Sequence, residues 1–183
     1  LARTRTHGGN PWELMRQRSL SKDQVIDFSV DVNPLGFPAV VRSTILEHLD
    51  DIRCYPDPSA TKLREAIAAY HQVPAESILP GNGTAELIGV LARLPQVKKC
   101  AIVVPTFGEY EWVMEQAGVT TALVQATEPN TFRLDVAQQD WPRLLEDVDV
   151  VVLCNPNNPT GVALAKTDVL EIAHRCRDVG ARL

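Results

Sequence analysis

Apolar residues recur along this chain at two different spacings, and the alternation between the two predicts an α/β protein. Spacings of three and four residues, typical of amphipathic helices, occur in the ranges 41–52, 63–70, 87–94, 109–117, 140–146 and 168–179. Short continuous apolar runs, typical of strands buried on both faces, occur in the ranges 101–104, 121–125 and 148–154. Strands that alternate with helices of this length predict βαβ units and a mostly parallel sheet.

The amino-terminal stretch has a different pattern. Residues 1–24 are polar and irregular, which predicts an arm outside the core, and residues 25–30 alternate weakly, as a short strand would. We therefore divide the chain into an arm with a first strand (1–33) and the start of a larger α/β domain (34–183). Gly180 has the position of a helix C-cap, after which an α/β unit would deliver its next strand, so we expect the domain to continue beyond Leu183.

Composition excludes several classes of function. The 183 residues are 45% hydrophobic and carry a net charge of −5, without a stripe rich in Lys and Arg, which argues against a nucleic-acid partner. No apolar stretch approaches the roughly 20 residues of a membrane span, and the polar start lacks the apolar segment of a signal peptide. We expect a cytoplasmic protein. The four cysteines have neither a Cys-x-x-Cys pair nor the close spacing of a disulfide scaffold, so we expect them to be reduced and in packed positions. No histidine pairs with Cys or Asp at metal-ligand spacing, so no metal is expected.

A turn rich in asparagine and proline, residues 155–161, follows the apolar run 148–154. Ligands of open α/β sheets bind outside the carboxyl ends of the strands, so this turn predicts polar groups for a ligand, Asn158 among them. Because Asn, Pro and Gly dominate turns generally, a plain connection is the alternative. Phe107 also follows a predicted strand, where its ring would face the same crevice or, alternatively, belong to the core.

The segment Gly83-Thr84-Ala85 opens a predicted helix. Small residues there allow backbone N–H groups to approach a phosphate, and the helix N-terminus adds favourable electrostatics of about 0.3–1 kcal/mol per anionic contact. The segment lacks the third glycine of a dinucleotide fingerprint and the Gly-Lys-Ser/Thr of a P-loop. A phosphate cradle is one interpretation, and a bare helix start is the other.

Asn158-Pro159-Thr160-Gly161 resembles the Asn-Pro-Thr-Gly motif of fold-type I pyridoxal 5'-phosphate (PLP) enzymes of the aminotransferase class I/II group. The resemblance implies an aspartate aminotransferase-like large domain, here incomplete, with three α/β/α layers and a mostly parallel sheet. It assigns Asn158 to the phenolic oxygen of the cofactor and Phe107 to stacking on the pyridine ring. Gly83, Thr84 and Ala85 would bind the cofactor phosphate.

The same resemblance implies a homodimer, in which Tyr55 would reach the phosphate of the neighbouring subunit's cofactor. The motifs in 7–10, 27–29 and 33–36 resemble the threonine-phosphate decarboxylase branch of the group, which makes the aminopropanol phosphate linker of cobalamin. The substrate would then be a small amino-acid phosphate, L-threonine O-3-phosphate, with the product (R)-1-aminopropan-2-ol O-phosphate. His7, Gly8, Gly9 and Asn33 would contact its phosphate or carboxylate.

Two alternatives accompany this interpretation. Histidinol-phosphate aminotransferases share the later motifs, so transamination of that or a related amino acid is one. The other is a non-catalytic PLP-binding or dimerisation fragment, because the family's Schiff-base lysine is expected beyond Leu183 and no catalytic residue can be assigned within the chain. Lys22 imitates the sequence context of that lysine, but it lies in the polar arm, where we expect a surface position.

Overall fold

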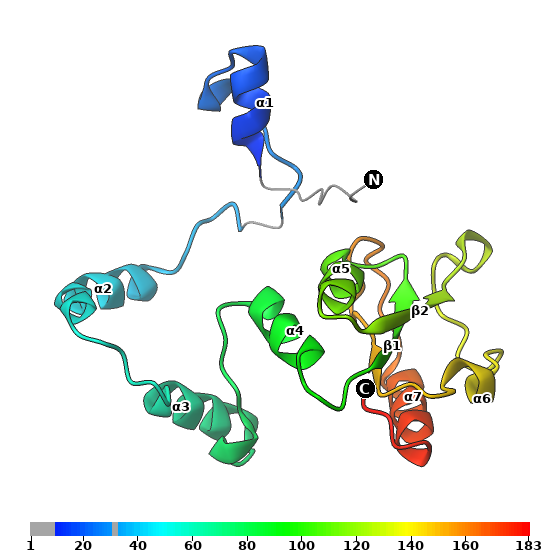
Figure 1. The fold of residues 1–183 in the computed structure, drawn as a ribbon. Helices are drawn as coiled ribbons and strands as arrows, with labels where there is room; N and C mark the ends of the chain where they lie inside the picture. The colour runs from blue at the N-terminus through cyan, green and yellow to red at the C-terminus, as the bar shows by residue number, and fades with distance from the viewer. Residues whose placement is uncertain (1–9, 31–32) are drawn as a thin grey trace. The chain divides into compact units, whose positions relative to one another are not determined.

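The computed structural model describes residues 10–30 and 33–183. Contacts between residues group the chain into two units, Leu1–Ser59 and Ala60–Leu183, and each is described by itself (Figure 1). The boundary predicted after residue 33 stays a prediction. None of the helices in the described ranges is long and apolar enough to cross a membrane.

The first unit contains helices α1 (Pro11–Arg18) and α2 (Ala39–Glu47) and the 3₁₀ turns η1 (Lys22–Gln24) and η2 (Leu49–Arg53). The irregular conformation predicted for 1–24 is therefore wrong where α1 forms. Pro11 lies in the first turn of α1, where proline is well tolerated. The negative charge of Glu13 in the first turn, and the positive charges of Arg16 and Arg18 in the last turn, interact favourably with the helix dipole. The helix has no apolar stripe and none of its residues is buried, so hydrophobic spacing could not predict it.

The strand predicted at 25–30 is also wrong, because those residues have no strand assignment. Ile26 is 81% exposed and Phe28 is 92% exposed. The Asp27 carboxylate accepts a hydrogen bond from the Ser29 backbone N–H at 2.8 Å, which closes a local turn. A weakly alternating segment becomes a strand only when a neighbouring strand takes its hydrogen bonds, and a single sequence cannot show whether that neighbour exists.

The second unit is built on a parallel three-stranded sheet of order β2-β1-β3, with β1 at Lys99–Val104, β2 at Thr120–Gln125 and β3 at Val150–Val152. Cys100 of β1 pairs with Thr121 of β2 and with Val150 of β3. Val150 also forms a parallel bridge with Arg182. The predicted parallel sheet is confirmed, although β3 is shorter than the apolar run 148–154 because the chain turns away once its backbone pairing with β1 ends.

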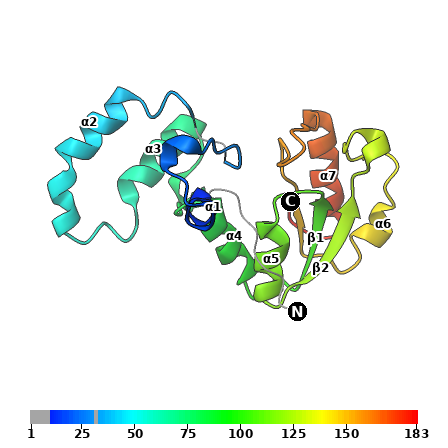
Figure 2. The same cartoon turned by 90° about the horizontal axis from the view of Figure 1, so that it is seen from above.

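Helices cover both faces of this sheet. The second unit contains α3 (Thr61–His71), α4 (Thr84–Ala92), α5 (Glu109–Gln116), α6 (Trp141–Leu144) and α7 (Lys166–Asp178), with 3₁₀ turns η3 (Ala75–Ser77) and η4 (Glu128–Asn130). Successive β1 residues face opposite sides: Ile102 packs in a core with α4 and α5, and Ala101 packs in a second core with α6 and α7. Figure 2 shows α5 on one side of the strands and α7 on the other. The three-layer α/β/α architecture is confirmed.

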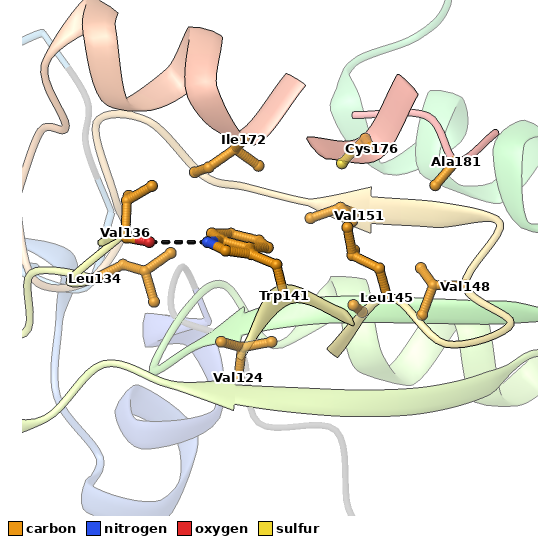
Figure 3. Packing of buried hydrophobic residues seen from close by; sticks show 11 residues of the cluster. Val124, Leu134, Val136, Trp141, Leu145, Val148, Val151, Ile172, Cys176 and Ala181 are labelled. Carbon is orange, nitrogen blue, oxygen red and sulfur yellow. Dashed lines mark hydrogen bonds between the residues drawn. The ribbon is translucent and has the colours of Figure 1, made fainter. Parts of the chain in front are cut away.

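The core beside α6 and α7 is centred on a tryptophan (Figure 3). The Trp141 indole N–H donates a 2.8 Å hydrogen bond to the carbonyl of Val136, and the residue is only 5% exposed. Val151, Ile172 and Cys176 belong to the same cluster. This packing supports the ends of β1 and β3, from which the candidate functional loops emerge.

All four cysteines are free. Cys100 and Cys176 are buried as expected, and burial raises the pKa of the Cys100 thiol to about 12 and also raises the pKa of Cys176. Cys154 is half-buried, whereas Cys54 is exposed. The expectation that the cysteines are packed therefore fails for Cys54.

Candidate functional site

The carboxyl ends of β1 and β3 lie side by side, and one asparagine joins the loops that follow them. The Asn157 side-chain NH₂ donates to the Pro105 carbonyl at 2.9 Å and to the Thr160 hydroxyl at 2.8 Å. The Asn157 side-chain carbonyl accepts a hydrogen bond from the Thr106 hydroxyl at 2.9 Å. Sequence reasoning singled out Asn158 and missed Asn157, although a second asparagine flanked by the same prolines was a signal for a loop held by side chains.

The loop after β3 is also closed on itself. The Asn157 N–H donates to the Val162 carbonyl at 2.8 Å, and the Gly161 N–H donates to the Asn157 carbonyl at 2.7 Å. The side chain of Asn155 accepts a hydrogen bond from the Leu164 N–H at 2.9 Å. Gly161 has φ +70°, a conformation that glycine adopts without strain. This loop presents Asn158 as an exposed residue.

Phe107 lies in the loop after β1 and is half-buried. Its ring meets the ring of Tyr110 edge to face, with centroids 5.7 Å apart and planes at 85°. Tyr110 belongs to the first turn of α5 and packs against the core on that side of the sheet. Phe107 therefore lies at the edge of the core.

The turn before α4 opens the helix with a glycine at the N-cap. Gly83 has φ +81°, and its N–H donates to the Gly81 carbonyl at 2.9 Å. A Cβ on Gly81 would lie 2.7 Å from the Leu87 Cδ2 atom, so a side chain there would require the Leu87 side chain to move. The Glu86 carboxylate accepts hydrogen bonds from the backbone and side-chain nitrogens of Asn82. Residues 81–86 are exposed, which leaves the first-turn N–H groups accessible.

A small cavity lies under the ends of β1 and β3. Its volume is about 20 Å³, which accommodates one water molecule. Ten residues line it: Val103, Pro105, Ala126, Phe132, Leu134, Leu153, Cys154, Asn157, Val162 and Leu164. A ligand with an aromatic ring cannot bind inside this space.

The predicted site residues fall into two groups. Gly83, Thr84, Ala85, Phe107 and Asn158 all lie in the second unit, and the structure brings the loops of Phe107 and Asn158 together through Asn157. The far end of α4 packs on α5 through Ala92. We still only predict that the first turn of α4 binds the same ligand as the loops of Phe107 and Asn158.

The other predicted residues lie in the first unit. Tyr55 is fully exposed, and Asn33 holds a turn by accepting a 3.0 Å hydrogen bond from the Leu35 N–H. His7, Gly8 and Gly9 lie outside the described residues. Lys22 is exposed at the start of η1, the surface position expected for it.

The residues present fit PLP. First-turn amides at Thr84 and Ala85 suit its phosphate, the half-buried Phe107 ring suits stacking, and the exposed carboxamide of Asn158 suits a ring oxygen. Within the ranges 10–30 and 33–183, no three His, Cys, Asp or Glu side chains gather as metal ligands would.

Comparison with known proteins supports the resemblance found in the motifs. Residues 23–183 match the family model "Aminotransferase class I and II". Threonine-phosphate decarboxylase of Salmonella typhimurium is 37% identical over 97% of this chain and 48% of its own length. Histidinol-phosphate aminotransferase of Desulfitobacterium hafniense is 35% identical over 87% of this chain and 46% of its own length.

A solved structure gives the same result for the fold. The histidinol-phosphate aminotransferase of Clostridium acetobutylicum superimposes with a TM-score of 0.75 and 28% identity, over 86% of this chain and 45% of that one. The chain thus spans about half the length of the proteins that it matches. By its sequence and by its fold, it belongs to the class I and II aminotransferase family.

Proposed function

We propose that this chain supplies the cofactor contacts of a PLP-dependent lyase that decarboxylates L-threonine O-3-phosphate to (R)-1-aminopropan-2-ol O-phosphate in cobalamin biosynthesis. The observation that carries the proposal is the 37% identity to a threonine-phosphate decarboxylase, which extends over 97% of the chain. It therefore includes the amino-terminal motifs that suggested this branch of the family.

The residues of this chain would hold the cofactor in three ways. The N–H groups of Thr84 and Ala85, with Gly83 as the turn, would bind the phosphate at the positive end of α4. Phe107 would stack on the ring, and Asn158 would donate its side-chain N–H to the phenolic oxygen. When bound, the pyridine ring of PLP draws electrons away from a bond that breaks at the substrate Cα.

The choice of the broken bond would depend on how the substrate is held, because the bond perpendicular to the cofactor ring is the one that cleaves. His7, Gly8, Gly9 and Asn33 would contact the substrate phosphate or carboxylate and so present the carboxylate for loss as carbon dioxide. We also propose a homodimer. The full exposure of Tyr55 leaves its hydroxyl available to a second copy of the chain, whose cofactor phosphate it would bind.

Transamination is the second candidate, and the similarity to histidinol-phosphate aminotransferases in sequence and fold favours it. One assay separates the two. The natural polypeptide that carries these residues is supplied with PLP and incubated either with L-threonine O-3-phosphate or with histidinol phosphate and 2-oxoglutarate. Carbon dioxide release from the first substrate supports the decarboxylase. Glutamate formation from the second pair, without carbon dioxide release from the first, supports the aminotransferase instead.

A non-catalytic role of these 183 residues is tested chemically. The protein is incubated with PLP, reduced with borohydride and digested, and the peptides are analysed by mass spectrometry. We expect no pyridoxyl group on any of the chain's lysines, since the Schiff-base lysine is expected beyond Leu183. An adduct on one specific lysine within the 183 residues would overturn that expectation.

A further inference from the structure

Two hydrogen bonds of the Asn157 side chain cross from the loop after β3 to the loop after β1. The carbonyl accepts from the Thr106 hydroxyl at 2.9 Å, and the NH₂ group donates to the Pro105 carbonyl at 2.9 Å. Thr106 is the residue before Phe107, and Asn157 is the residue before Asn158. The two bonds therefore join the chain directly beside both side chains that are predicted to hold the cofactor ring.

Both N–H bonds of the Asn157 carboxamide are engaged within the protein. One donates to the Pro105 carbonyl and the other donates to the Thr160 hydroxyl at 2.8 Å. The Thr160 hydroxyl also accepts a 3.3 Å hydrogen bond from the Val162 N–H, so it is itself held by the loop. A carboxamide has two donor hydrogens, and neither of these is available to a ligand. Asn157 can therefore influence a ligand through the residues that it holds in place.

Phe107 and Asn158 are each held within their own loop by other contacts. The Phe107 carbonyl accepts a 3.2 Å hydrogen bond from the Tyr110 N–H, and the two rings meet edge to face. Edge-to-face pairs favour one relative orientation of the rings. The Asn158 N–H donates to the Cys154 Sγ atom at 3.4 Å. The two bonds of Asn157 add what these contacts do not supply, which is a connection from one loop to the other.

The surroundings of the Asn157 carboxamide strengthen this connection. Asn157 is half-buried and borders the small cavity under the strand ends, together with apolar residues that include Leu153, Val162 and Leu164. A hydrogen bond in an environment with little water is electrostatically stronger than one in bulk solvent. The carboxamide is therefore suited to hold the two loops at a fixed spacing.

We propose that Asn157 and Thr106 are positioning residues that set the separation between the Phe107 ring and the Asn158 carboxamide, and so fit this pair to the pyridine ring and phenolic oxygen of PLP. The inference rests on the proposed cofactor, and neither residue touches the cofactor itself. Groups that hold a ligand must keep their places to within about half an ångström. A break between the two loops should therefore weaken binding of the ring, whereas the phosphate contacts proposed at the first turn of α4 should remain.

The first test needs no cofactor. Crystal structures without PLP are determined for the natural polypeptide that carries these residues and for its Thr106→Val and Asn157→Ala variants. We expect the distance from the Phe107 ring centroid to the Asn158 side-chain carbonyl carbon to change by about half an ångström or more in both variants. Thr106→Ser keeps the hydroxyl and is expected to keep the natural distance. An unchanged distance in both Thr106→Val and Asn157→Ala overturns the inference.

The second test measures the cofactor. PLP is titrated into the apo-protein, and both its dissociation constant and the circular dichroism band of bound PLP are recorded. Thr106→Val is expected to weaken binding about three- to tenfold and to reduce the band, as loss of one hydrogen bond predicts. Asn157→Ala is expected to weaken binding further. The double variant is expected to lose no more than Asn157→Ala alone, since that substitution already removes the partner of Thr106.

Inorganic phosphate, used as a competitor of PLP, separates the ring contacts from the phosphate contacts. Its inhibition constant is expected to stay the same in Thr106→Val and Asn157→Ala, because the first turn of α4 keeps its N–H groups. An equal weakening of phosphate and PLP in these variants would show a general effect of stability and would overturn the inference.

Two control variants address the substitutions themselves. Thr44→Val also removes a hydroxyl, one that donates to the Val40 carbonyl at 2.8 Å in an exposed position of α2, and PLP binding is expected to stay the same. Val97→Ala removes buried methyl groups before the amino end of β1, at the sheet edge opposite to the two loops. It is expected to lower stability and to leave the dichroism band unchanged.

The outcomes separate this inference from the proposed function. A natural protein that fails to bind PLP overturns the proposed function. A natural protein that binds PLP no more tightly than Thr106→Val and Asn157→Ala overturns only the positioning role of these residues. If Asn157→Ala does not fold, the comparison of Thr106→Val with Thr106→Ser decides, because recovery of affinity by serine requires the hydroxyl that reaches Asn157.

Discussion

At the scale of single residues, Asn157 has the clearest structural role. Its side chain makes three hydrogen bonds, to groups in both loops that follow the strands. Asparagine suits this position because one carboxamide both donates and accepts. The neighbouring Asn158 is left exposed. Only the structure shows that one of these adjacent asparagines joins the loops while the other stays exposed.

We therefore expect Asn157→Ala to lower the free energy of unfolding by about 1–3 kcal/mol, because partly buried groups at Pro105 and Thr106 lose their partner. The measurement is urea unfolding followed by circular dichroism. Asn130→Ala is the control, since Asn130 makes its 2.7 Å bond to the Arg133 carbonyl in an exposed turn, and a change within about 0.5 kcal/mol is expected. Equal effects of the two substitutions would contradict the role given to Asn157.

The Asp149 carboxylate binds the backbone at the start of β1. Its carboxylate accepts hydrogen bonds from the N–H groups of Lys98 and Lys99, at 2.7 and 2.9 Å. These two bonds are the main reason why the pKa of Asp149 is lowered, and the nearby charges of Lys98 and Arg182 contribute less.

The sign of the resulting pH dependence follows from the lowered pKa. A carboxyl group whose pKa is lower in the folded state stabilises that state above its unfolded pKa, and the contribution is lost as the pH falls through the folded value. Thermal unfolding midpoints of the natural protein and of Asp149→Asn are expected to differ at neutral pH and to converge as the pH falls below about 4. A difference that stays constant with pH would show that the charge is not responsible.

At the scale of elements, the start of α4 depends on backbone geometry. Gly83 has φ +81° at the N-cap of the helix, and Gly118 has φ +77° in the turn after α5. A Cβ on either residue would meet no atom within 4 Å. The two glycines therefore share a positive φ and open space at the Cβ position, but they differ in their relation to the candidate site.

Gly83→Ala and Gly118→Ala are each expected to lower the free energy of unfolding by about 1–3 kcal/mol, the cost of a positive φ for a residue with a Cβ. Only Gly83→Ala is expected to weaken PLP binding as well. A change in the turn would reorient the first N–H groups of α4, which are proposed to bind the phosphate. Thermal unfolding and PLP titration of both variants check this. Weakened binding in Gly118→Ala too would point to a general effect of stability.

At the scale of the whole molecule, the two units differ in how much core they contain. The buried hydrophobic residues all lie in the second unit, between Ile88 and Ala181, within the described part of the chain. In the first unit Phe28, Leu35 and Phe37 are among the large apolar residues that stay exposed. The stability measured for this chain should therefore report on the second unit.

Trp141 tests that expectation. Trp141→Ala is expected to lower the free energy of unfolding by about 3–5 kcal/mol, because it opens a cavity in the core and leaves the Val136 carbonyl without its donor. Urea unfolding followed by far-ultraviolet circular dichroism measures this. Trp12→Ala is the control, since Trp12 is half-exposed in α1, and its effect should be small. Comparable losses in both variants would mean that the first unit contributes as much as the second.

The sequence by itself determined the features that depend on neighbours along the chain. Apolar runs without alternation predicted strands buried on both faces, spacings of three and four predicted most helices, and the Asn-Pro-Thr-Gly motif indicated the family that the comparisons then confirmed. Helix α1 was missed because a helix without buried residues needs no apolar stripe. Its proline, acidic first turn and basic last turn are nevertheless signals of a helix in the sequence.

Only the tertiary structure decided what depends on partners far apart in the chain. The strand expected at 25–30 does not form, because strand formation requires a hydrogen-bonding neighbour that local sequence does not specify. The contact of Asn157 with Thr106 spans 51 residues and connects the loops that follow two different strands. Such contacts arise from the pairing of β1 with β3, and a periodic pattern contains no information about which strand lies beside which.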